Sequence, residues 1–368
     1  MMAGSRNIGA ALIAASVLFA GCSDGTGPGE PFDPAHAQAD VALLGTLFES
    51  QQLAAFAELS TRFDLGSGTP LAAVAGARAL VMGDASPSTA RRIARQAAEA
   101  LSLSSSSVGA PSLKSLPTEV LGTTFVFDTT SDSYVESDRT GAPATGVRFI
   151  VYALDPISGD PIVSQEVGYA DLIDLSPASQ TSAGLRLLLV GGGTTYLDYS
   201  LTATPTQTTV TIGVEGFLSD GTTTLDFAVD ADLVFDTNEF TIDVDFAFAI
   251  PAHQFSTTGS IDATSTSTSS LAEIDLLITS GGTRIRYEIV EDDFSETINA
   301  TVYVNNRIFA TITGDLNDPT VAGAGGAELT TEETAALIGM GQLAVACFDF
   351  FVRLWEPAGN VLGGGLLP

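Results

Sequence analysis

The sequence predicts an α+β fold, in which N-terminal helices precede a large antiparallel β meander and a C-terminal helix packs on the apolar face of that sheet. Three observations predict it. Hydrophobic and polar residues alternate with period two from about Leu121 to Gly314, short turn motifs separate the alternating segments, and stretches with helical periodicity lie on both sides. The sheet is expected to be curved or to form a half-barrel.

Composition limits the class of protein. The chain has 368 residues, and 44 acidic against 14 basic residues give a net charge of −30. Charged residues make up only 16% and hydrophobic residues 45%, which is typical of a globular protein and not of a disordered chain. Such an acidic surface repels phosphate backbones, so we expect no nucleic-acid partner.

The first 21 residues read as a signal peptide. Arg6 supplies a positive start, and the apolar run over residues 8–20 is too short to span a membrane. The run ends in Phe19-Ala20-Gly21-Cys22, which resembles the lipobox of bacterial lipoproteins, with Phe in place of the usual Leu. The resemblance implies that Cys22 is diacylated and becomes the mature N-terminus. The alternative is an ordinary cleaved signal peptide with an incidental Cys.

Residues 22–37 are rich in Gly and Pro and are predicted to form a flexible tether. Ser, not Asp, follows Cys22, which favours the outer membrane over the inner membrane in well-studied envelopes. Apolar residues then recur at helical spacing, so residues 38–101 are predicted to be a helical segment. A Ser-rich stretch over residues 102–118 is predicted to be a linker, and residues 119–368 to form the β domain.

The period-two pattern is clearest over residues 241–250, where Ile242, Val244 and Phe246 share one parity and Asp243 and Asp245 the other. One apolar and one polar face indicate a sheet that is buried on one side. The two-residue turns Gly281-Gly282 and Asn305-Asn306 suit tight hairpins. Further predicted strands are Tyr196–Ala203, Thr209–Leu218, Glu273–Thr279, Arg284–Val290, Ile298–Val304 and Ile308–Thr313.

Residues 331–355 are predicted to form the C-terminal helix. Thr330 and Glu333 have the spacing of a capping box at its start. An apolar stripe runs along it, comprising Leu337, Met340, Ala344, Cys347, Phe348, Phe351 and Trp355. The stripe favours a helix that covers the apolar side of the sheet over a membrane span, because Gln342, Asp349 and Arg353 interrupt the segment.

The residues for common catalytic mechanisms are scarce. The only histidines are His36 and His253, no G-x-S-x-G motif is present, and the zinc patterns need more Cys and His than the chain has. Cys347 lies on the apolar stripe, where we expect a packing role and no disulfide with Cys22. The sequence therefore assigns no catalytic residue, no cofactor and no metal ligand, and Cys22, as the lipidation site, is the one functional position.

Calcium stays open as an alternative. Residues 219–300 contain 16 carboxylates and two arginines, but the alternation spreads them over a sheet face instead of gathering them in one loop. The glycine runs at residues 191–193 and 323–326 lack the Lys-Ser/Thr of a phosphate loop and are expected to be turns.

The sequence thus predicts a membrane-tethered, non-enzymatic cell-envelope lipoprotein with a structural or interaction role. Its body would lie in the periplasm or at the cell surface, and its partners would be the membrane and an envelope protein. One alternative is a carrier of lipid or another hydrophobic ligand, since the outline is similar to that of the half-barrel periplasmic lipoprotein carriers. A remote alternative is a glycoside hydrolase that uses a pair of carboxylates.

Overall fold

A computed structural model of the chain describes residues 116–340, except 178–181, 207, 237–238, 267, 293, 317 and 339, together with residues 33, 35–36, 39, 43, 47 and 54–56. Cys22 and the predicted signal peptide lie outside the described residues, as do Cys347 and the second half of the predicted C-terminal helix. Of the predicted helical segment 38–101, only residues 39, 43, 47 and 54–56 are described, and these are helical.

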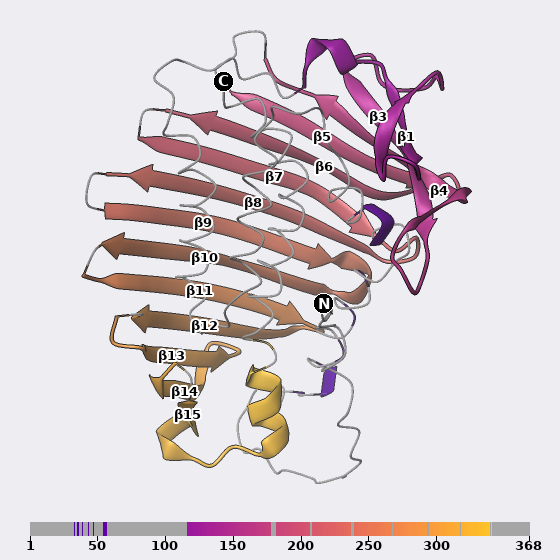
Figure 1. Ribbon diagram of the computed structural model, residues 1–368. Helices are drawn as coiled ribbons and strands as arrows, with labels where there is room; N and C mark the ends of the chain where they lie inside the picture. Colours follow the sequence, from indigo (N-terminus) through magenta and orange to yellow (C-terminus); the bar gives the residue numbers. More distant parts are fainter. Residues whose placement is uncertain are drawn as a thin grey trace, which may run out of the picture. The chain divides into compact units, whose positions relative to one another are not determined.

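The main element is one open sheet of 15 strands (Figure 1). The strands are β1 (Thr124–Asp128), β2 (Ser133–Ser137), β3 (Gly146–Leu154), β4 (Pro161–Asp174), β5 (Ala183–Gly191), β6 (Thr194–Pro205), β7 (Thr209–Ser219), β8 (Thr224–Phe235), β9 (Glu239–Ile250), β10 (Phe255–Thr266), β11 (Ser270–Ser280), β12 (Thr283–Asp292), β13 (Thr297–Val304), β14 (Arg307–Asp315) and β15 (Asp318–Gly323). Three short 3₁₀ turns accompany them: η2 (Thr118–Val120), η3 (Pro251–His253) and η4 (Ala324–Gly326).

From β3 to β15 every strand is hydrogen-bonded to the next in sequence, and every one of these pairs is antiparallel. The predicted meander is therefore confirmed. The predicted two-residue turns are also confirmed, because Asn305 and Asn306 have φ of 50° and 65° and Gly281 and Gly282 have φ of 54° and 90°. Positive φ at both central residues matches the turn twist to the strand twist.

The sheet differs from a pure meander at its first edge. β1 pairs with β2 as a hairpin, but its other edge pairs in parallel with β3, through Thr124 opposite Arg148 and Phe125 opposite Phe149. The strand order at this edge is consequently β4-β3-β1-β2, and the sheet is mixed. The sheet does not close on itself: β2 and β15 are its two edge strands.

Successive hairpins in the middle of the sheet repeat at an offset of 30 residues. Turns at one end of the strands contain Gly221, Pro251 and Gly281. At the opposite end, the backbone N–H of the first turn residue donates to the carbonyl three residues on, at N···O distances of 2.7, 2.9 and 2.7 Å for residues 206, 236 and 266. The middle of the sheet is therefore a series of similar two-stranded units, a periodicity that the sequence analysis did not identify.

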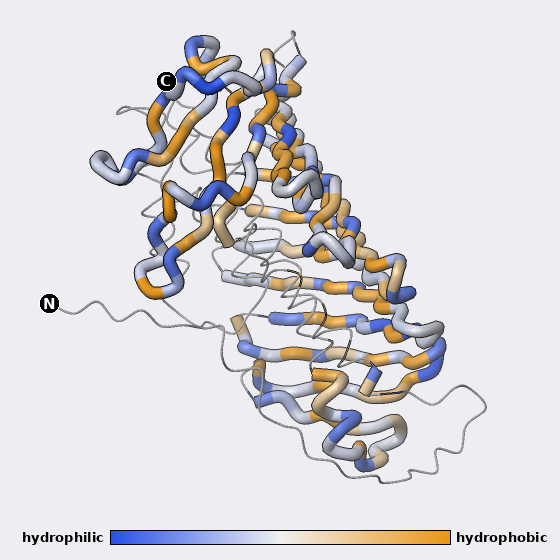
Figure 2. The backbone as a smooth tube through the Cα atoms, turned by 90° about the vertical axis from the view of Figure 1, so that its right-hand side faces the viewer, coloured by the Kyte–Doolittle hydropathy of each residue, from blue (hydrophilic) through white to orange (hydrophobic). Residues whose placement is uncertain are grey.

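One face of the sheet forms the hydrophobic core. Along β5 to β13, most residues of one parity are buried and most of the other parity are partly or fully exposed. Figure 2 shows the matching alternation of hydrophobic and hydrophilic residues along the strands. The largest side chains with almost no exposure include Tyr199, Tyr287, Phe149 and Phe255. The prediction of a sheet buried on one side holds for these strands.

The described part of the C-terminal helix packs against this apolar face beside β12. Residues 331–338 and 340 are helical, and Leu337 and Met340 belong to the same buried cluster as the sheet. The Tyr287 hydroxyl donates to the backbone carbonyl of Leu337 at 2.9 Å. The capping box is confirmed, since Glu333 N–H donates to Thr330 Oγ1 at 3.1 Å and Thr330 N–H donates to the Glu333 carboxylate at 2.8 Å. No helix among the described residues is long and apolar enough to cross a membrane.

Candidate functional site: the acidic face of strands β8 to β11

The exposed face of the central strands carries a row of acidic residues in register. Asp232 on β8 is the cross-strand partner of Asp243 on β9, Asp243 is the partner of Asp262 on β10, and Asp262 is the partner of Glu273 on β11. All four side chains are exposed. Because neighbouring strands are about 4.8 Å apart, four carboxylates lie in line across four strands. We call these four residues the acidic row.

A second pair of carboxylates lies beside the acidic row. Asp230 on β8 is directly opposite Asp245 on β9, two positions along each strand from the row. The hairpin offset of 30 residues relates several of these positions: Asp232 to Asp262, Asp243 to Glu273, and Asp245 to Asp275. The repeated hairpin thus brings acidic residues to equivalent places on successive units.

Like charges at directly opposed positions destabilise a sheet. The effect is visible at Asp243, whose pKa is raised above the usual value of 3.8; partial desolvation contributes most, followed by the carboxylates of Asp262, Asp245 and Asp232. One polar contact helps to stabilise the row, since Thr211 Oγ1 donates to the Asp232 carboxylate at 2.6 Å. The row is consequently a patch of unbalanced negative charge.

The basic residues of the sheet lie to either side of the acidic row. No Lys or Arg occurs between Arg186 on β5 and Arg284 on β12. On one side, the Arg186 guanidinium donates to both carboxylate oxygens of Asp198 at 2.7 and 2.6 Å. The strands from β6 to β11 therefore carry no Lys or Arg, and the four acids of the row have no cationic side chain on their own strands.

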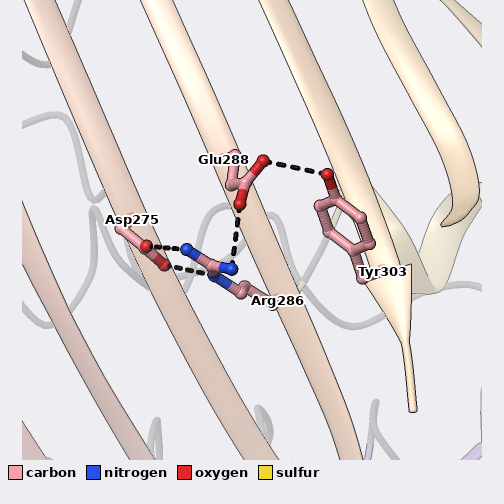
Figure 3. A network of polar contacts seen from close by, with 4 residues as sticks. All are labelled: Asp275, Arg286, Glu288 and Tyr303. Atoms are coloured by element: carbon pink, nitrogen blue, oxygen red, sulfur yellow. Dashed lines mark hydrogen bonds and ion pairs between the residues drawn. The ribbon is translucent and has the colours of Figure 1, made fainter. Parts of the chain in front are cut away.

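On the other side, Arg286 on β12 organises the network shown in Figure 3. Its guanidinium makes a two-point contact with Asp275 on β11, and its Nη1 lies 2.9 Å from Glu288 Oε1. The Tyr303 hydroxyl on β13 donates to the other oxygen of Glu288 at 2.9 Å. These bonds raise the pKa of Arg286 and of Tyr303, because each stabilises the protonated form. The network balances the charge of Asp275 and marks the end of the unbalanced patch.

A more buried ion pair joins β3 and β4. Arg148 Nε and Nη2 donate to the Asp171 carboxylate at 2.6 and 2.7 Å, and the guanidinium also lies 3.7 Å from the centre of the Tyr169 ring. The Asp171 side chain is only 6% exposed. The two residues are direct cross-strand partners, so the pair connects the central strands to the first edge of the sheet.

The structure separates most of the residues that the sequence analysis considered for chemistry. His253 is exposed in η3, in the turn from β9 to β10, and Gly192 and Gly193 form the turn from β5 to β6. Within the described residues, no three His, Cys, Asp or Glu side chains lie close enough to hold a metal ion. The acidic residues are spread across the strands at sheet spacing.

Sequence reasoning missed two buried acids. Glu291 on β12 is 8% exposed and lies on the apolar parity of its strand, in line with Ile285, Tyr287 and Ile289. Asp171 is the second. The signal for Glu291 is present in the sequence, because it is a carboxylate at a position where the alternation requires a hydrophobic residue.

Comparison of the chain with protein-family models, with curated proteins and with solved structures gives no match. The functional argument therefore rests on the residues themselves.

Proposed function

We propose that this protein is a lipid-anchored, non-enzymatic protein of the bacterial cell envelope, with a structural or interaction role. The Phe19-Ala20-Gly21-Cys22 motif supports the anchor, with the outer membrane favoured over the inner membrane. The body is held in the periplasm or at the cell surface. Its partners are the membrane, through the lipid on Cys22, and an envelope protein.

The observation that carries the interaction role is the division of the sheet into two unlike faces. One face is buried against the core, while the other presents the acidic row to solvent with no Lys or Arg on β7 to β10. Unbalanced charge at directly opposed positions costs stability. Such an uncompensated negative surface can attract a cationic partner, and it can also keep copies of the protein apart by repulsion.

The carrier of a hydrophobic ligand is the second candidate. It requires an apolar cavity on the inner face of the sheet. Large aromatic side chains of this face are instead buried: Phe227, Phe246 and Phe248 are 5%, 9% and 3% exposed. Their burial supports the structural role over the carrier.

The anchoring is tested by fractionation of cells that express the protein and its Cys22→Ser variant. We expect the wild-type protein in the membrane fraction and the variant released from it. Cys347→Ala is the matched control, because it removes the other thiol of the chain and should leave the protein on the membrane. Retention of Cys22→Ser on the membrane would contradict the anchor.

The structural role is tested by native mass spectrometry of the protein extracted from its membrane. We expect the mass of the polypeptide with its covalent lipid and nothing more. A non-covalent lipid that copurifies would favour the carrier. Calorimetric titration with calcium tests whether the acidic face binds this ion, and we expect no saturable heat of binding.

A further inference from the structure

In the turns that join β5 to β15, the two ends of the strands differ in charge. The β1–β2 and β3–β4 turns, which carry the exposed Asp132 and Asp160, are not among them. Because the strands are antiparallel, alternate turns gather at opposite ends of the sheet. We call the turns at residues 191–194, 219–224, 250–255, 280–284 and 304–307 the Gly281 rim. We call the turns at residues 205–209, 235–240, 266–271, 291–297 and 315–318 the Asp292 rim.

Backbone hydrogen bonds join neighbouring turns within each rim. In the Gly281 rim, Asn305 N–H donates to the carbonyl of Arg284 at 2.8 Å, and Arg284 N–H donates to Asn305 Oδ1 at 3.0 Å. In the Asp292 rim, Leu316 N–H donates to the carbonyl of Glu296 at 2.9 Å. Each rim therefore contains one pair of neighbouring turns that are joined by hydrogen bonds.

The Asp292 rim is strongly acidic, since its sequence contains no Lys or Arg. Its fully or partly exposed carboxylates are Asp236, Glu239, Asp292, Glu296, Asp315 and Asp318. The Gly281 rim contains one carboxylate, Asp220, against Arg284 and Arg307, and both arginines are exposed. In a chain with a net charge of −30, the Gly281 rim is thus an exception.

The start of the described chain lies at the Gly281 rim. A Cβ placed on Gly281 would stand 2.8 Å from Nε2 of His36. Just before His36, the Asp33 carboxylate accepts hydrogen bonds from the backbone N–H groups of Ala35 and His36 at 3.0 and 3.2 Å. Asp33 is separated from Cys22 by 11 positions, which span at most about 40 Å when fully extended.

We propose that the anchored protein approaches an anionic lipid surface with its Gly281 rim and holds its Asp292 rim away from the bilayer. The inference rests on the proposed lipidation of Cys22. The contact of His36 with Gly281 brings the end of the tether to this rim. An anionic leaflet attracts Arg284 and Arg307 and repels the carboxylates of the opposite rim within a Debye length, about 8–10 Å. Both effects favour the same orientation.

Energy transfer from each rim to the bilayer tests the orientation. The full-length lipidated protein, in a Cys347→Ala background, receives one fluorescent donor through either Ala252→Cys in the Gly281 rim or Thr268→Cys in the Asp292 rim. Both positions are exposed. The vesicles contain phosphatidylglycerol and a headgroup acceptor. We expect greater transfer from position 252 than from position 268, and a smaller difference on phosphatidylcholine vesicles. Equal or greater transfer from position 268 on phosphatidylglycerol would overturn the proposal.

Two glycine variants test the contribution of His36. Gly281→Ala places a methyl group against the His36 ring, whereas Gly282→Ala has a similarly positive φ and no atom within 4 Å of the added Cβ. Gly282→Ala is therefore the matched control for backbone strain. We expect Gly281→Ala to reduce the difference in transfer between the rims and Gly282→Ala to preserve it. An equal effect of the two variants would refute the role of His36.

Vesicle flotation separates failure of this proposal from failure of the anchor. If the protein with Cys22 intact does not float with the vesicles, the proposed lipidation is wrong. If it floats and the transfer is equal from both rims, the anchor holds and the orientation is wrong.

Discussion

Replacement of Asp243 by Asn should stabilise the protein. Asp243 has a carboxylate at the directly opposed position on both sides, Asp232 on β8 and Asp262 on β10. Two unit charges about 5 Å apart repel by about 0.8 kcal/mol in water. A Debye length near 10 Å reduces this to about 0.5 kcal/mol per pair. The variant should therefore be more stable by about 1 kcal/mol at about 0.1 M salt and neutral pH.

The measurement is urea denaturation of the wild-type protein and the variant. We expect a higher midpoint with an unchanged slope. Asp226→Asn is the matched control, because Asp226 is an exposed aspartate on β8 whose cross-strand partners are Phe217 and Ala249. At 1 M salt, where the Debye length is about 3 Å, the gain should fall to about 0.3 kcal/mol. A gain of the same size for Asp226→Asn, or one that ignores salt, would refute the reasoning.

The pH dependence of the same variant has a defined sign. The pKa of Asp243 in the folded protein is raised, so its ionised form is disfavoured by folding. The cost is fully present above the folded-state pKa and disappears as pH falls below the usual aspartate value, near 3.8. The advantage of Asp243→Asn should vanish over the same range, and an advantage that persists at lower pH would contradict the electrostatic origin.

Three further predictions concern the contacts that hold the sheet and its helix. Arg148→Ala should destabilise the protein by about 3 kcal/mol, because it leaves the buried carboxylate of Asp171 unpaired, whereas Arg286→Ala removes an exposed pair and should cost at most about 1 kcal/mol; equal losses in urea denaturation would contradict the difference in burial. Thr330→Ala removes the helix cap and should lower the free energy of unfolding by about 1 kcal/mol, as measured by thermal unfolding. Thr331→Ala, at the exposed threonine that follows, is the control. Tyr287→Phe deletes the buried hydroxyl that donates to the helix backbone and should lower the free energy of unfolding by about 1–2 kcal/mol. An unchanged free energy of unfolding would contradict a stabilising role for this hydrogen bond.

Much of the fold could be predicted because its pairings are local. Each strand from β3 to β15 pairs with its sequence neighbours, so alternation and turn residues suffice to place it. The parallel contact of β1 with β3 could not be predicted in this way. It skips β2, and neither the turn residues nor the alternation indicate that the second edge of β1 pairs with β3.

The candidate site was predictable in part. Alternation places Asp232, Asp243, Asp262 and Glu273 on the exposed face of the sheet. It does not place them opposite one another, because a slip of two residues keeps every side chain on its face while it changes all cross-strand neighbours. Turn length and hydrogen bonding set the register, and only the tertiary structure shows the acidic row.

The sequence by itself determined the features that depend on neighbours in the chain: the meander, its two unlike faces, the tight turns and the capping box of the C-terminal helix. Tertiary structure alone decided the features that depend on residues far apart. These include the mixed edge of the sheet, the burial of Asp171, and the contact between His36 and Gly281. The physical reason is that backbone periodicity selects a face for each side chain, whereas packing and register select the side chains it meets.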